Sequence, residues 1–72
     1  MTNTKKLRAL ILERDLTQEQ VAAHIGITPA SLNYKINNKR EFKASEIKAL
    51  VELLNISGED VSMIFFAHDV DL

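Results

Sequence analysis

Apolar residues recur at helical spacing along most of the chain. Leu7, Leu10 and Ile11 follow the i, i+3, i+4 rule of one helix face, and this stripe ends near residues 13–15. Any of residues 2–4 can cap the start of this helix, because Thr and Asn oxygens accept hydrogen bonds from free backbone N–H groups. No alternating strand pattern of useful length occurs, so the pattern predicts an all-α fold.

The next two helices have well-marked boundaries. Thr17 and Gln20 have the spacing of a capping box, and Gly26 fits a helix exit because glycine adopts the left-handed conformation at little cost. Thr28 then caps a third helix with Pro29 at its first position, where a missing N–H loses no hydrogen bond. The inward-facing residues are predicted to be Val21, Ala22, Ile25, Leu32 and Ile36. We therefore expect a helix-turn-helix over residues 17–37.

Two further helices complete the predicted fold. Phe42 anchors a polar, basic loop, and a fourth and a short fifth helix follow, the latter capped at 57–60. Their apolar stripes are Ile47, Leu50, Val51 and Leu54, then Val61, Ile64 and Phe65. The prediction is one compact bundle of five short helices over residues 1–66, with a C-terminal tail at 67–72.

Composition narrows the function classes. The 72 residues suit one domain, and without cysteine neither disulfides nor a thiolate zinc site can stabilise it. The two histidines lie too far apart to indicate a metal site, and Ser31 has no convincing catalytic partner. We expect no enzyme, cofactor, metal or small-molecule substrate. Without an apolar run of signal-peptide or membrane length, we also expect a cytoplasmic protein that does not enter a membrane.

Charge is divided unevenly along the chain. All nine Lys and Arg lie in residues 1–50 together with five acids, whereas residues 51–72 hold the other five acids and no Lys or Arg. The excess of basic residues in 1–50 favours a polyanion as the partner, but only on the face that these residues form. Two helices joined by so short a turn also cross steeply, and a protruding helix fits the DNA major groove.

Residues 16–28 together with 31–39 resemble the helix-turn-helix of the Cro/repressor (XRE) family, and residues 42–47 and 60–66 are similar to small Cro-like phage and prophage regulators. The resemblance implies a lambda-repressor-like domain that binds double-stranded operator DNA, with a homodimer as one arrangement. It places Pro29, Ala30, Asn33 and Tyr34 toward the bases. It assigns the DNA backbone to Gln18, Thr28, Ser31, Lys35, Asn38, Lys39, Arg40 and Lys43.

A second interpretation keeps the fold and changes the partner. Pro29 and Ala30 replace the amide or charged residues that the family often has there, Asn38 stands where it usually has glycine, and the chain is slightly acidic. The alternative is a modulator or antirepressor that binds a companion repressor. Its tentative contact residues are Met63, Phe66, Val70 and Leu72, although a frayed C-terminus would explain them equally well.

Overall fold

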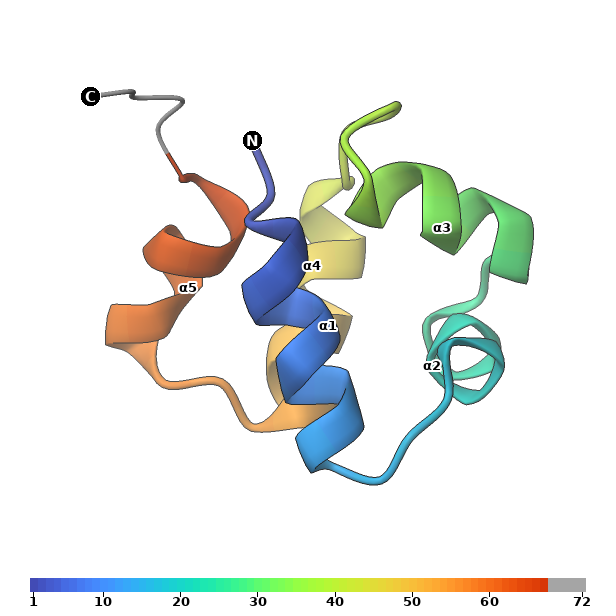
Figure 1. Cartoon of the computed structure of the whole chain (residues 1–72), viewed down its shortest axis with the longest axis horizontal. Helices are drawn as coiled ribbons and strands as arrows, with labels where there is room; N and C mark the ends of the chain where they lie inside the picture. The colour runs from blue at the N-terminus through green and yellow to red at the C-terminus, as the bar shows by residue number, and fades with distance from the viewer. Residues whose placement is uncertain (68–72) are drawn as a thin grey trace.

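Capping side chains and left-handed residues divide the chain into five helices in the computed structural model, which describes residues 1–67. They are α1 (Thr4–Glu13), α2 (Gln18–Ile25), α3 (Pro29–Ile36), α4 (Ala44–Leu54) and α5 (Gly58–Phe65). In Figure 1, α1 runs through the middle with α4 behind it, α2 and α3 lie on one side and α5 on the other. No strand occurs within residues 1–67, and the expected all-α bundle of five helices is confirmed.

Four of the helices begin at a side chain that caps the first turn, and all four caps agree with the sequence prediction. In each, a side-chain oxygen accepts a hydrogen bond from the backbone N–H three residues later. The acceptors and donors are Asn3 and Lys6, Thr17 and Gln20, Thr28 and Ser31, and Ser57 and Asp60. Gln20 also returns a bond to the Thr17 N–H at 2.9 Å, which completes the capping box.

The start of α4 differs, because the ammonium group of Lys43 cannot accept a hydrogen bond. Instead, Oε1 of Glu46 accepts the backbone N–H of Lys43 at 2.8 Å. This is the half of a capping box that the third helical residue supplies. The carboxylate of Glu46 therefore sits at the point where the loop after α3 enters α4.

Left-handed residues end or follow the first four helices. Gly26 has φ +84° at the exit of α2, as predicted, while Asp15, Asn38 and Asn55 have φ between +52° and +64°. Asp and Asn tolerate this conformation better than most side chains, because their short polar groups bond locally. Because the chain turns sharply at these positions, five short helices can pack around one core.

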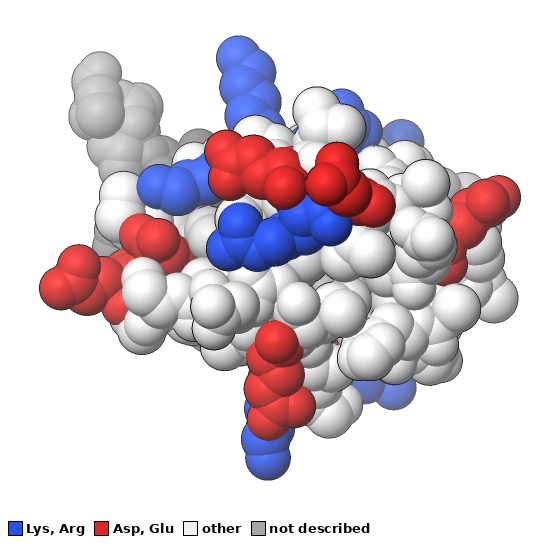
Figure 2. Space-filling view, turned by 90° about the horizontal axis from the view of Figure 1, so that it is seen from below, with Lys and Arg blue, Asp and Glu red and all other residues white. Residues whose placement is uncertain are grey.

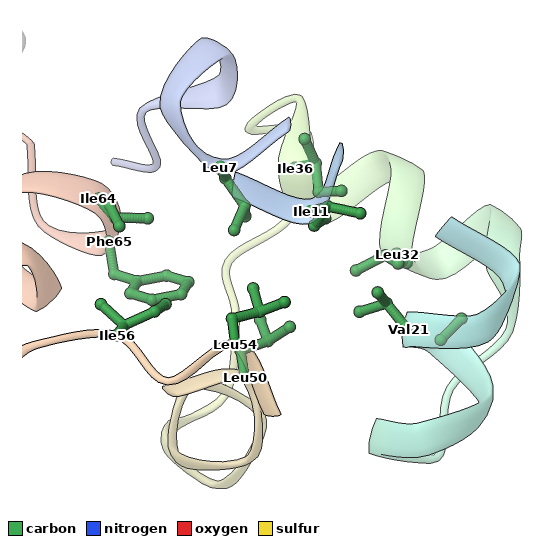
Figure 3. Packing of buried hydrophobic residues seen from close by; sticks show 11 residues of the cluster. Leu7, Ile11, Val21, Leu32, Ile36, Leu50, Leu54, Ile56, Ile64 and Phe65 are labelled. Carbon is green, nitrogen blue, oxygen red and sulfur yellow. The ribbon is translucent and has the colours of Figure 1, made fainter. Parts of the chain in front are cut away.

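The core is continuous from one end of the molecule to the other (Figure 3). Val21 and Leu32 fill the end between α2 and α3, and Ile64 and Phe65 fill the α5 end. Between these ends lie Leu7, Ile11, Ile36, Leu50 and Leu54, whereas Ile56 lies beside Phe65 at the α5 end. Phe42 packs edge-on against Phe65 with ring centroids 5.7 Å apart, so it anchors the α3–α4 loop as expected.

Candidate nucleic-acid interface

The turn between α2 and α3 leaves one side of α3 in solvent. Leu32 and Ile36 are fully buried, which turns the opposite side of the helix outward. Pro29, Ala30 and Asn33 are exposed, and Tyr34 is 44% exposed. The four residues predicted to face DNA bases thus form one exposed row along α3.

Tyr34 is held in place from the loop that follows α3. The guanidinium carbon of Arg40 lies 5.6 Å from the centre of the Tyr34 ring, within the range of a cation–π contact. The backbone N–H of Lys39 also donates to the Tyr34 carbonyl at 2.8 Å. The exposed row of α3 therefore adjoins the exposed cations Lys39 and Arg40.

Lys35 is the clearest correction to the sequence prediction, which placed it on the DNA backbone. Its side chain is only 8% exposed, and its Nζ lies 2.7 Å from each carboxylate oxygen of Glu46. Lys35 follows Leu32 by three residues, so the spacing that buries Leu32 and Ile36 turns Lys35 inward too. It cannot contact phosphate in this arrangement.

Asn38 was also expected on the DNA backbone, but its amide is already bonded. Its Oδ1 accepts the backbone N–H of Thr2 at 2.7 Å, and its Nδ2 donates to the carbonyl of Thr2 at 2.9 Å. The Thr4 hydroxyl donates to the Ile36 carbonyl at 2.6 Å. The N-terminal segment thus fastens the end of α3. Asn38 is exposed, so its expected contact with the DNA backbone stays a prediction beside this structural role.

The other residues assigned to the DNA backbone remain accessible. Thr28, Lys39, Arg40 and Lys43 are exposed, whereas Gln18 and Ser31 are half-buried at the starts of α2 and α3. The Thr28 hydroxyl caps the Ser31 N–H, so one of its acceptor positions is used within the protein. These six residues come from α2, α3 and the loop after it, and nothing in their contacts removes them from the surface.

The sequence analysis missed Arg8, which α1 brings to this surface. Its guanidinium donates to Oδ1 of Asn37 at 3.1 Å, and the Asn37 amide in turn donates to the Asn33 carbonyl at 2.9 Å. Arg8 also lines one shallow hollow with Gln18. In the sequence, Arg8 lies at the side of the apolar stripe of α1, and the packing of α1 against α3 was needed to place it here.

The surface of α5 has a different character. Met63 and Phe66 are 54% and 57% exposed and line one hollow with Ser62 and Ala67. Glu59 and Asp60 lie in the first turn of the same helix. The other two residues expected to bind a protein partner, Val70 and Leu72, lie outside the described residues.

Charge is mixed on a further face of the molecule. The face seen from below in Figure 2 carries acidic and basic side chains interspersed among uncharged ones. Within residues 1–67, no three His, Asp or Glu side chains gather as metal ligands, and no helix has the length and hydropathy needed to cross a bilayer. The α3 row and the adjoining loop join exposed hydrogen-bonding groups to the exposed cations Lys39, Arg40 and Lys43.

Comparison with known families agrees with this geometry. A family model described as helix-turn-helix matches residues 7–61, from the middle of α1 into α5. No match is found among curated proteins.

Proposed function

Because the chain belongs to the Cro/repressor type of the helix-turn-helix family, whose members bind DNA and regulate transcription, we propose that it binds operator DNA through α3 as the regulator of a phage or prophage switch. The observation that carries this proposal is the exposed row of α3 set over a buried Leu32 and Ile36. A helix presented in this way fits the major groove, which is about 12 Å wide.

Within the groove, Asn33 is the main reader of sequence. A side-chain amide can bond adenine through two atoms, a contact worth about 1–3 kcal/mol of discrimination. Tyr34 adds a hydroxyl and a ring whose position Arg40 restricts, while Ala30 and Pro29 offer only apolar contact to a thymine methyl group. Direct reading of bases thus depends on a small set of side chains.

Phosphate contacts set the register of the protein on DNA. Lys39, Arg40 and Lys43 supply the charge next to the end of α3, and Gln18, Thr28 and Ser31 supply neutral donors at two helix starts. Arg8 extends this set toward Gln18. A pair of chains related by twofold symmetry would place two α3 helices about 34 Å apart, on half-sites one turn apart.

Selection of duplexes from a random-sequence library, followed by gel shifts at several salt concentrations, tests this function. The expected result is a single enriched sequence class bound more tightly than its scrambled version, with affinity that falls as salt rises. Failure to retard any duplex at micromolar protein would refute autonomous DNA binding.

A second candidate function rests on α5. Met63 and Phe66 expose apolar surface beside Glu59 and Asp60, and residues 51–67 contain no Lys or Arg. This chemistry suits a basic partner protein, so the alternative is a modulator or antirepressor that binds a companion repressor.

Size-exclusion chromatography of the chain mixed with a repressor encoded nearby tests the alternative. Co-elution that is lost in a Met63→Ser/Phe66→Ser double variant would support it. An unchanged elution profile on mixing would contradict it.

A further inference from the structure

Lys35 and Glu46 form a buried ion pair between α3 and α4. Both side chains are 8% exposed, and the ammonium group lies 2.7 Å from each carboxylate oxygen. Glu46 Oε1 also accepts the Lys43 N–H, so one carboxylate in the first turn of α4 bonds both the side of α3 and the end of the loop. Within the described residues, no buried side-chain nitrogen or oxygen lacks a hydrogen-bond partner.

A pair of this kind is not required for stability alone. Desolvation of two charges offsets most of their attraction, and well-packed apolar residues can replace a buried pair with little loss. An ion pair differs from apolar packing in being directional, because the ammonium must point at the carboxylate. It therefore restricts how the two helices are turned toward each other more than an apolar contact does.

The direction of Lys35 determines the direction of the residues before it. Successive side chains of an α-helix are about 100° apart around its axis. When Lys35 points inward to Glu46, Asn33 lies on the opposite side of α3 and Tyr34 about 100° around the axis, and both are exposed. Leu32 and Ile36 hold α3 in the core, but apolar contacts allow small rotations that a two-oxygen ion pair resists.

We propose that Glu46 is a positioning residue of DNA recognition, which holds Lys35 and so fixes the rotation of α3 that presents Asn33 and Tyr34 to the bases. The proposal rests on the proposed function in one respect, namely that α3 reads DNA. It assigns Lys35 a role without any contact to DNA. Glu46 acts on sequence discrimination and not on the electrostatic part of binding.

The test compares Glu46→Gln, Lys35→Met and the double variant with wild type on the library-selected duplex and its scrambled version. The Gln side chain keeps an acceptor for the Lys43 N–H, so the start of α4 is retained. Glu52→Gln is the matched control, since it removes the same charge from an exposed position of α4. All affinities are measured where circular dichroism shows each variant folded.

We expect the ratio of the two affinities to fall at least about fivefold in each single variant, which corresponds to the lower end of one bidentate base contact. The affinity ratio of the double variant should fall no further than that of either single variant. The salt slopes of all variants should match wild type, and so should the affinity ratio of Glu52→Gln. A retained ratio in Glu46→Gln would overturn the proposal. So would a salt slope that becomes shallower by about one in Lys35→Met alone, because that result makes Lys35 a phosphate contact.

Amide hydrogen exchange of the free proteins separates this proposal from the proposed function. Exchange of the α3 amides should be faster in Glu46→Gln than in wild type and Glu52→Gln. If wild type binds no duplex but this difference is found, the proposed function fails while the positioning of α3 by Glu46 stands. Equal exchange in all three proteins would overturn the positioning role whatever the DNA result.

Discussion

Individual residues of the α3 surface have different proposed roles: some are proposed to contact DNA, and others bond within the protein. Asn33 and Tyr34 are exposed and are the proposed base contacts, whereas Lys39 and Arg40 are exposed cations proposed to contact phosphate. Lys35 and Asn38 lie among these residues in sequence, yet their polar groups bond within the protein. Neighbouring residues of one short segment thus have different roles, and single substitutions can separate them.

Asn33→Ala is expected to weaken binding to the selected duplex by about 1–3 kcal/mol and to leave binding to the scrambled duplex nearly unchanged. The helix should persist, because the bond from Asn37 reaches the Asn33 backbone and not its side chain. Fluorescence anisotropy with the two duplexes measures this effect. An equal loss on both duplexes would show that Asn33 does not read sequence.

Lys39→Ala is expected to weaken binding to both duplexes alike. Because Lys39 is exposed and carries one charge toward phosphate, the slope of log affinity against log salt concentration should become shallower by about 0.9. A salt titration measures the slope, and Lys48→Ala is the control because it removes a charge from α4 outside the proposed interface. An unchanged slope in Lys39→Ala would show that Lys39 does not contact phosphate.

At the scale of elements, the end of α3 is fixed by a backbone motif and by two neighbouring segments. The N–H groups of Asn38 and Lys39 donate to the carbonyls of Lys35 and Tyr34, as in a Schellman motif with Asn38 in the left-handed position. Thr2 bonds the Asn38 amide, and Glu46 bonds Lys35. Helix α3 is therefore tied to the N-terminal segment and to α4.

Asn38→Gly and Asn38→Ala separate the two roles of Asn38. Both variants lose the two hydrogen bonds to Thr2, each worth about 0.5–1.5 kcal/mol. Glycine adopts φ +64° freely, whereas alanine adds a left-handed penalty of about 1–2 kcal/mol. We expect urea unfolding to rank the proteins as wild type, then Gly, then Ala in stability; equal stability of the Gly and Ala variants would contradict the left-handed assignment.

The ion pair between Lys35 of α3 and Glu46 of α4 also predicts that the stability of the protein depends on pH. Burial acts to raise the pKa of Glu46, but the hydrogen bonds from Lys35 and Lys43 and their positive charges outweigh it, and the pKa lies below its ordinary 4.5. A carboxyl with a lowered folded-state pKa adds stability that is fully present above its ordinary pKa. This stability is lost as the pH falls through the lowered value.

Wild type and Glu46→Gln should therefore differ in unfolding free energy by a constant amount from neutral pH down to about pH 5, and by less below that. Urea unfolding at a series of pH values measures the difference. A difference that already shrinks above about pH 5, or persists unchanged in strong acid, would contradict the lowered pKa of Glu46.

At the scale of the whole molecule, one small core stabilises every surface described above. Leu7, Leu32, Leu50 and Leu54 are fully buried and come from three of the helices. Domains of this size are stable by only about 0.05–0.15 kcal/mol per residue. Any change that opens a cavity in this core should therefore affect α3 and α5 together.

Leu50→Ala is expected to cost about 2–5 kcal/mol, because it removes a fully buried side chain from the centre of the core. The same substitution at Leu12, which is 75% exposed, should change stability by less than about 0.5 kcal/mol. Thermal unfolding followed by circular dichroism compares the two variants. Similar melting temperatures for both would contradict the single continuous core.

The sequence alone determined where helices begin and end, because caps, left-handed glycine and proline at a first helical position act within a few residues of one another. Thr17, Gly26 and Thr28 were assigned correctly on this basis, and so was the exposure of Asn33 and Tyr34, which follows from helical spacing. Lys35 and Glu46 also have buried spacing, three residues after Leu32 and four before Leu50. Two opposite charges on two inward stripes were thus a pattern that could have predicted the pair.

Only the tertiary structure decided which distant residues meet. Thr2 and Asn38, Arg8 and Asn37, and Lys35 and Glu46 are brought together by the packing of the N-terminal segment, α1, α3 and α4. Helical periodicity places a side chain around its own axis, but it does not give the angle at which two helices cross. A polar side chain near a surface can bond a neighbouring segment or remain open to a ligand, and the crossing angle decides between these outcomes.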